Sequence, residues 1–185
     1  LPPPPARLDS QGIAKPAAAP QSGPVVDRFA ITSGKIARPQ ITLLYGAGGI
    51  GKSSLAALAP NPVFLDVENG TGALDVQRIG DLDRLEDVRA VLQSNRLDGY
   101  ATVVLDSATR AEELATEFTL RTVPHEKGHH VDRLEGYGFG KGTTHVYESF
   151  MLLLQDLDSQ VRRGRNVIVI AHDCINDVPN PVGED

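Results

Sequence analysis

The chain has 185 residues and a formal charge of −6, with 41% hydrophobic and 23% charged residues. This composition is typical of one globular domain with a sizeable core. The acidic balance argues against a globally basic nucleic-acid binder, although it leaves room for a local basic loop. Cys174 is the only cysteine, so no internal disulfide can form, and a cytoplasmic protein is expected. No apolar run approaches the ~20 residues that cross a bilayer, and we recognise no secretory signal, so no membrane partner is expected.

The first 27 residues are predicted to be a disordered leader. Residues 1–24 consist largely of Pro, Ala, Gln, Ser and Gly, and they have too little apolar surface to offset the entropy of ordering. A plain linker is the favoured interpretation, and a proline-rich recognition motif is the alternative. The folded core is expected over residues 28–185, with order beginning near residues 25–29. The chain begins with Leu1 rather than Met, which favours a fragment.

Strands and helices are predicted to alternate through this core. Short apolar runs predict strands at 41–46, 63–68, 101–106 and 166–172. Helical spacing of apolar residues, with proline and glycine stops, predicts helices at 52–59, 82–92, after 106, and 146–161. Alternating β and α units predict an α/β fold, with a parallel sheet covered by helices on both faces. The ligand site of such a sheet lies beyond the carboxyl ends of its strands.

The most specific motif is a phosphate-binding loop that follows the first predicted strand. The pattern G-x-x-x-x-G-K-[ST] is formed by Gly46, Ala47, Gly48, Gly49, Ile50, Gly51, Lys52 and Ser53. Its glycines let backbone N–H groups wrap a polyphosphate, Lys52 would reach the β- and γ-phosphates, and Ser53 would ligate Mg²⁺. We expect the loop, together with Ser54 in the following helix, to bind ATP and Mg²⁺. The alternative is a glycine-rich turn with an exposed lysine.

Acidic residues end two other predicted strands. Asp106 follows an apolar run, where a P-loop ATPase places the carboxylate that holds Mg²⁺ through water; the alternative is a cap of the next helix. Glu68 closes the second strand, with Asp66 two residues earlier on the same face. A carboxylate there can orient or activate the attacking water, and Glu68 is preferred to Asp66 for this role. The alternative is a solvated acid in a turn.

His172 ends the fourth predicted strand. A polar side chain at this place can contact the γ-phosphate or the attacking water and report hydrolysis to the following loop. The alternative is a histidine that makes only a local hydrogen bond. Glu68, Lys52 and His172 form the predicted catalytic set.

The polar, glycine-rich stretch 121–145 combines basic and aromatic residues. Cationic side chains for phosphates and aromatic rings for base stacking are typical of single-stranded DNA binding. The predicted contacts are Arg133, Tyr137, Phe139 and Lys141. Three alternatives remain: Lys141 acting in trans on a neighbour's nucleotide, a solvated loop without a ligand, and a metal site formed by His125, His129 and His130.

Three further runs carry a family resemblance: Ile-Thr-Ser-Gly-Lys at 31–35, Asn-Gly-Thr-Gly-Ala-Leu-Asp-Val at 69–76, and Glu-Gly-Tyr-Gly-Phe-Gly-Lys-Gly at 135–142. With the phosphate loop and the strand ends, residues 28–185 resemble the RecA-like ATPase core. More narrowly, they resemble the phage-type, AAA-domain nucleotide-binding proteins linked to single-strand annealing and recombination.

This resemblance implies that Glu68 is the catalytic glutamate and that Asp106 is the Walker B acid. His172 departs from RecA itself, which has at this place a glutamine that links nucleotide state to DNA binding. RecA-like sheets continue with strands beside the phosphate-loop strand, so further strands beyond Asp185 are expected. A phage-encoded member would act in the bacterial host cytoplasm.

The leading hypothesis is an oligomeric, Mg²⁺-dependent ATPase that acts on single-stranded DNA in recombination or repair. The alternatives are a P-loop phosphotransferase, a nucleotide-dependent switch and a non-catalytic binding module. Partition ATPases carry an additional lysine at the position of Ala47, and ABC ATPases carry a Leu-Ser-Gly-Gly signature, so both classes are disfavoured.

Overall fold

The computed structural model describes residues 33–34 and 37–173. The predicted leader at 1–27, residues 31, 32 and 35 of the 31–35 run, and Cys174 lie outside these residues. The chain divides into two units, Leu1–Ile36 and Ala37–Asp185, and the fold below is that of the second unit.

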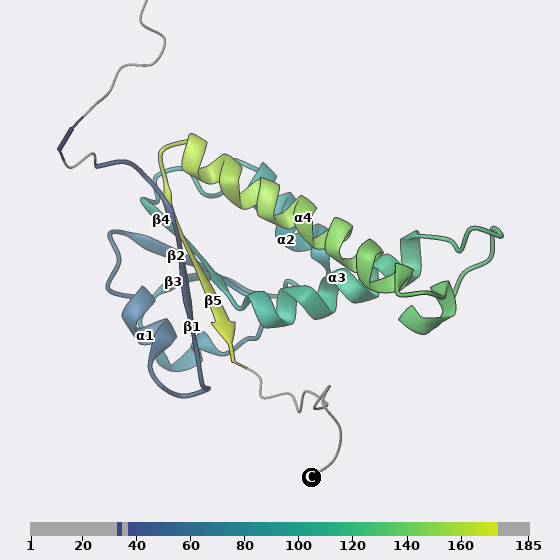
Figure 1. Ribbon diagram of the computed structural model, residues 1–185. Coiled ribbons are helices and arrows are strands. Elements are labelled where there is room, and N and C mark those ends of the chain that lie inside the picture. The colour runs from purple at the N-terminus through teal and green to yellow at the C-terminus, as the bar shows by residue number, and fades with distance from the viewer. Residues whose placement is uncertain (1–32, 35–36, 174–185) are drawn as a thin grey trace, which may run out of the picture. The chain divides into compact units, whose positions relative to one another are not determined.

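A five-stranded parallel sheet forms the centre of this unit (Figure 1). Its strands are β1 (Ile41–Gly46), β2 (Pro62–Asp66), β3 (Gln77–Ile79), β4 (Thr102–Asp106) and β5 (Asn166–His172). Their order in the sheet is β1-β5-β4-β2-β3. The four predicted strands are therefore confirmed, with β2 ending at Asp66 so that Glu68 lies in the turn after it. The three-residue edge strand β3 was not predicted.

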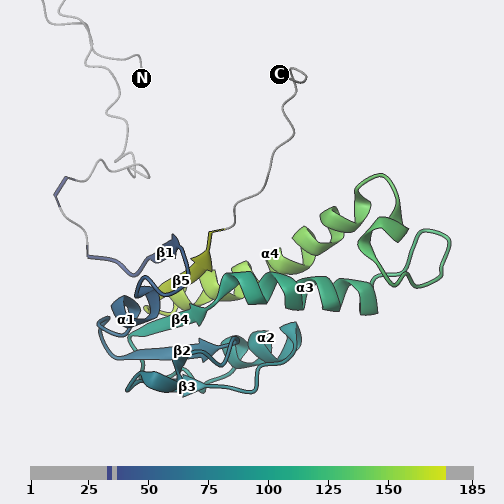
Figure 2. The same ribbon diagram turned by 90° about the horizontal axis from the view of Figure 1, so that it is seen from below.

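Helices cover both faces of the sheet, as the α/β prediction requires (Figures 1 and 2). The helices are α1 (Lys52–Ala56), α2 (Leu85–Gln93), α3 (Ala108–Thr122) and α4 (Lys141–Arg162). Short 3-10 turns occur at η1 (Thr71–Ala73) and η2 (Leu134–Tyr137). None of the helices within the described residues is long and apolar enough to cross a membrane.

The two faces carry cores of different size. The larger core lies under α2, α3 and α4 and includes Leu65, Leu105 and Val167 from the central strands. The smaller core, under α1, contains Ala56, Phe64, Val104 and Ile170. Alternate residues of β2, β4 and β5 enter opposite cores because successive side chains of a strand point to opposite faces. This double burial explains why these strands appear in the sequence as continuous apolar runs.

Three helix boundaries differ from the prediction, the first being that helix α2 begins at Leu85 rather than at Leu82. Helix α1 has only five residues, and tighter 3-10-type turns, such as the one closed by the Ala59 N–H to Ala56 carbonyl bond (3.1 Å), carry the chain on toward Pro60. Helix α4 begins at Lys141 rather than near residue 146. Its first turn contains Gly142, where a Cβ atom would collide with the backbone of Leu134. Glycine is needed here because η2 packs directly against the start of α4.

The parallel register aligns the carboxyl ends of the strands. Asp66 lies level with Asp106 across β2 and β4, and Gly46 lies level with His172 across β1 and β5. The start of the phosphate loop and the predicted catalytic residues therefore converge at one edge of the sheet, which is where α/β proteins bind ligands.

Candidate nucleotide site

The phosphate loop connects β1 to α1 in the arrangement that the motif requires. Gly51, the residue before α1, has φ +94°, and Gly49 has φ +77°. These left-handed conformations favour glycine, and they turn the loop around the start of the helix. The motif and these conformations together favour an anion cradle formed by backbone N–H groups.

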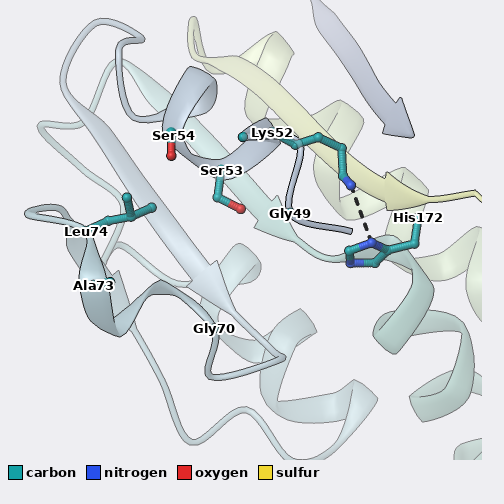
Figure 3. Close-up of a pocket in the computed structure, with 9 residues that line it drawn as sticks. Gly49, Lys52, Ser53, Ser54, Gly70, Ala73, Leu74 and His172 are labelled. Carbon is teal, nitrogen blue, oxygen red and sulfur yellow. Dashed lines mark hydrogen bonds between the residues drawn. The ribbon is translucent and has the colours of Figure 1, made fainter. Parts of the chain in front are cut away.

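Lys52 lies within this cradle rather than in solvent, with 8% of its surface exposed. Its Nζ atom donates hydrogen bonds to the carbonyl oxygens of Gly46 (2.7 Å) and Ala47 (2.9 Å). The same atom lies 3.4 Å from Nδ1 of His172, so the two side chains point toward each other (Figure 3). The lysine charge is thus held where the phosphates of a nucleotide would lie.

The predicted Mg²⁺ ligands are in direct contact. Ser53 Oγ donates a hydrogen bond to Oδ2 of Asp106 at 2.6 Å, and Asp106 is only 6% exposed. Burial is the main factor that raises the pKa of Asp106, and the negative charges of Glu68 and Asp66 raise it further. The Ser53 hydrogen bond and the neighbouring His172 act in the opposite direction.

This donor set fits Mg²⁺. The ion prefers oxygen ligands, and a hydroxyl beside a buried carboxylate supplies two of them. Asp106 is buried beside two further carboxylates, Glu68 and Asp66, and these surroundings raise its pKa, so a cation bound here would offset the excess negative charge.

Glu68 is linked to its neighbours through both carboxylate oxygens. Oε1 accepts a hydrogen bond from Ser107 Oγ, and Oε2 lies 3.4 Å from His172 Nε2. Because His172 also approaches Lys52, polar contacts run from Lys52 through His172 and Glu68 to Ser107. The structure therefore brings together the three residues of the predicted catalytic set.

Asp66 has a different environment from Glu68. It is almost completely buried, and its carboxylate accepts hydrogen bonds from Gly70 N (2.9 Å), Thr71 N (3.2 Å) and Thr71 Oγ1 (2.5 Å). These bonds shape the turn that leads into η1. Asp66 thus stabilises the turn beside the site. The Glu68 side chain, by contrast, is 32% exposed and can be reached by solvent.

A pocket of about 240 Å³ opens between the phosphate loop and this turn. Figure 3 shows the residues that line it: Gly49, Gly51, Lys52, Ser53, Ser54, Gly70, Ala73, Leu74 and His172. The loop and His172 were predicted to bind nucleotide, but Ala73 and Leu74 were not. In the sequence, Ala73 and Leu74 stand out only as members of the run 69–76, which carries the family resemblance but has no assigned role.

The AAA domain family matches residues 38–184 of the chain. This match covers well over half of the sequence. The chain belongs to the AAA domain family. No curated protein matches this AAA domain. Among solved structures it is similar to a prototypical ATPase from the type III secretion system of pathogenic bacteria, with 17% identity and a TM-score of 0.43. That match covers 78% of this chain and 47% of the secretion ATPase, so the AAA domain spans about half of its length.

The segment 121–145 of the AAA domain lies at the opposite end of α3 from the nucleotide pocket (Figures 1 and 2). The prediction that Tyr137 stacks on DNA bases is wrong. Tyr137 is only 4% exposed, and its hydroxyl donates to the carbonyl oxygens of Val123 (2.5 Å) and Thr119 (3.3 Å). Its ring is therefore an anchor that joins η2 to the end of α3.

The other predicted contacts in this segment are accessible. Phe139 is fully exposed in a turn between Gly138 and Gly140, with φ +50°. Arg133 is exposed, and Lys141 forms an ion pair with Glu126. The segment thus presents one aromatic ring and nearby cationic groups to solvent.

The histidines of this segment do not form a metal site in the structure. His125 and His129 stack on each other, with ring centroids 4.6 Å apart. Across the described part of the chain, no three His, Cys, Asp or Glu side chains are grouped to hold a metal ion. The alternative based on His125, His129 and His130 is therefore unsupported.

Proposed function

We propose that this AAA domain hydrolyses ATP with the help of Mg²⁺. The observation that carries the proposal is a set of polar contacts around one pocket. Lys52, Ser53 and His172 line this pocket, Ser53 donates a hydrogen bond to Asp106, and Nε2 of His172 lies 3.4 Å from Oε2 of Glu68. These groups supply the positive charge that binds the phosphates, the metal ligands and the water-orienting carboxylate that phosphoryl transfer requires.

Binding begins at the phosphate loop. The N–H groups at the start of α1 and the Lys52 ammonium attract the triphosphate, for which Lys52 exchanges its bonds to the Gly46 and Ala47 carbonyls. Ala73 and Leu74 line the pocket opposite the loop and offer apolar surface to the base. This arrangement orients the nucleotide with its phosphates toward Glu68 and Asp106.

Each protein group near the γ-phosphate has a different role in the proposed reaction. Ser53 and Asp106 would hold Mg²⁺, which neutralises charge on the phosphates when bound. Glu68 orients the attacking water and accepts its proton. His172, between Lys52 and Glu68, contacts both the phosphate-binding and the water-activating group, so it can sense the loss of the γ-phosphate.

ATP turnover of the full protein, measured by phosphate release, tests this function. We expect Mg²⁺-dependent hydrolysis that Lys52→Ala abolishes. Glu112→Gln is the matched control for Glu68→Gln, because Glu112 is an exposed acid on α3 away from the pocket. Equal turnover for Glu68→Gln and Glu112→Gln would remove Glu68 from the mechanism. Phosphate transfer to an added nucleoside in place of water would favour the phosphotransferase alternative.

We further propose that the segment 121–145 contacts single-stranded DNA and that this contact stimulates hydrolysis. The fully exposed Phe139 can stack on a base, while Arg133 and Lys141 can contact phosphates. Helix α3 provides a physical connection, since its N-cap residue Ser107 contacts Glu68 and the carbonyl of Thr119 near its other end accepts a hydrogen bond from Tyr137 of this segment. The RecA-like resemblance of the sequence supports the same partner and a role in recombination or repair.

ATP turnover with and without a single-stranded oligonucleotide tests the DNA proposal. We expect stimulation that Phe139→Ala reduces and Tyr147→Ala retains, because Tyr147 is an exposed aromatic on α4 outside the segment. Hydrolysis that is indifferent to DNA in the unmodified protein would refute the coupling and leave the ATPase proposal intact.

A further inference from the structure

The mechanism proposed above gives Ser107 no chemical task, yet its side chain contacts Glu68, the group proposed to act on the attacking water. Ser107 lies between β4 and α3 and is completely buried. Its Oγ donates a hydrogen bond to Oε1 of Glu68 across 39 positions of sequence. The same Oγ accepts a hydrogen bond from Arg110 N at 3.3 Å, which caps α3. Ser107 therefore has two separable roles, one in the helix and one toward Glu68.

The direction of the hydrogen bond follows from the chemistry of the partners. An ionised carboxylate can only accept, so the hydroxyl proton of Ser107 must point at Glu68. The N-cap bond uses a lone pair of Oγ and leaves that proton free. One hydroxyl can thus satisfy both contacts at the same time.

The bond from Ser107 is the shorter of two side-chain contacts that Glu68 makes. Glu68 lies in the turn after β2, beyond the sheet ladder, and its side chain is about one third exposed. Its second carboxylate oxygen has only the longer 3.4 Å contact to His172. A long, partly exposed side chain has several accessible rotamers, and a single strong hydrogen bond from a buried donor restricts them.

The backbone around Glu68 is held by the same part of the molecule. Val67 N (3.0 Å) and Glu68 N (3.4 Å) both approach the carbonyl oxygen of Asp106, the residue before Ser107. The main chain and the carboxylate of Glu68 are therefore both held by the β4–α3 junction. That junction also carries Asp106, so it sets the spacing between the predicted Mg²⁺ ligand and the predicted catalytic carboxylate.

We propose that Ser107 is a positioning residue that holds the Glu68 carboxylate in the orientation required to act on the attacking water. This inference rests on the proposed ATPase function. Ser107 acts through Glu68 and has no contact of its own with the reacting atoms. Its loss lowers the rate of the chemical step, because a small misplacement of a catalytic group has a large effect on rate. Nucleotide binding is retained, because the phosphate loop is unchanged.

Three substitutions separate the two roles of the hydroxyl. Ser107→Ala and Ser107→Gly both remove the bond to Glu68, but glycine is tolerated at an N-cap far better than alanine. Ser107→Thr retains the hydroxyl. We expect kcat to fall about 10- to 100-fold in both the alanine and the glycine variants, which corresponds to one hydrogen bond to a charged group. We expect KM for ATP to stay within about twofold of the wild-type value, and threonine to restore most of kcat.

A double variant that combines Ser107→Ala with Glu68→Gln tests whether Ser107 acts through Glu68. If Ser107 acts through Glu68, Ser107→Ala causes no further loss of kcat in the Glu68→Gln protein. Additive losses would overturn the inference, as would normal kcat in Ser107→Gly alongside a slow Ser107→Ala, which would indicate helix capping alone. Thermal unfolding of each variant identifies any that fail to fold, and the glycine variant then decides the question. Absence of ATP turnover in the wild-type protein would instead refute the proposed function itself.

Discussion

Asp106→Asn should stabilise the nucleotide-free protein while abolishing its response to Mg²⁺. The asparagine has nearly the same size, and its carbonyl oxygen can still accept the Ser53 hydrogen bond. It removes a negative charge that is disfavoured in the folded state, since burial raises the pKa of Asp106 and the nearby Glu68 and Asp66 reinforce this effect. We therefore expect a higher Tm for Asp106→Asn than for the wild-type protein at neutral pH without nucleotide.

The pH dependence of this difference follows from linkage. Because the folded-state pKa of Asp106 is raised above its ordinary value of 3.8, the wild-type protein gains stability from protonation of this group at low pH. That stability is lost as the pH rises from 3.8 through the raised folded value. The stability advantage of Asp106→Asn should therefore be small in acid and reach its full size at neutral pH.

The expected rise in Tm on nucleotide binding can be calculated. A ligand at 100 times its Kd stabilises the folded state by about 2.7 kcal/mol. At roughly 2–4 °C per kcal/mol for a chain of this size, the wild-type Tm should rise by about 5–11 °C with saturating MgATP. The Asp106→Asn protein lacks the charged Mg²⁺ ligand, so it should show only the smaller rise that ATP with EDTA produces in both proteins.

Thermal unfolding monitored by circular dichroism measures these shifts in three conditions: no ligand, ATP with EDTA, and MgATP. Asp132→Asn is the matched control, because Asp132 is exposed and lies in the segment 121–145. A full MgATP shift in Asp106→Asn would refute the assignment of Asp106 as a Mg²⁺ ligand. A lower Tm than wild type without nucleotide would refute the electrostatic reasoning.

Three further predictions concern hydrolysis, packing and DNA binding. Glu68→Gln should lower kcat by about 10²- to 10⁴-fold with little change in KM, as steady-state phosphate release would show; a change confined to KM would contradict a role in the chemical step. Gly142→Ala should destabilise the fold by about 1–3 kcal/mol, because its Cβ would meet the Leu134 backbone, whereas Gly80→Ala meets only an ordinary 3.6 Å contact; equal Tm values for these two variants would refute the close packing of η2 on α4. Phe139→Ala should weaken binding of a fluorescent single-stranded oligonucleotide by about 1–3 kcal/mol, and unchanged binding would rule out base stacking.

The fold could be predicted where burial is strong and repetitive. Strands β2, β4 and β5 are covered on both faces, so their apolar runs were unambiguous, and β1 was identified by the phosphate loop that follows it. The edge strand β3 could not be predicted. Its sequence Gln77-Arg78-Ile79 has two exposed residues, and its conformation depends on pairing with β2.

The parts of the site that could be predicted are those that belong to a short motif or lie at the end of a predicted strand. The phosphate loop, Asp106 and Glu68 all follow from residue type and position along predicted strands. Tyr137 was misassigned because a glycine-rich run does not reveal which of its aromatic rings is buried, and the deciding contacts come from the end of α3. The bond between Ser107 and Glu68 was not predicted because it joins the ends of two strands that pair only in the folded sheet.

The most direct test of the account is ATP hydrolysis by the purified full protein with and without Mg²⁺, compared with Lys52→Ala. Lys52 is held inside the phosphate loop by two backbone carbonyls, where it can exchange these bonds for phosphate oxygens. We expect phosphate release that requires both Mg²⁺ and Lys52. Equal phosphate release by the wild-type and Lys52→Ala proteins, or none from either, would contradict it.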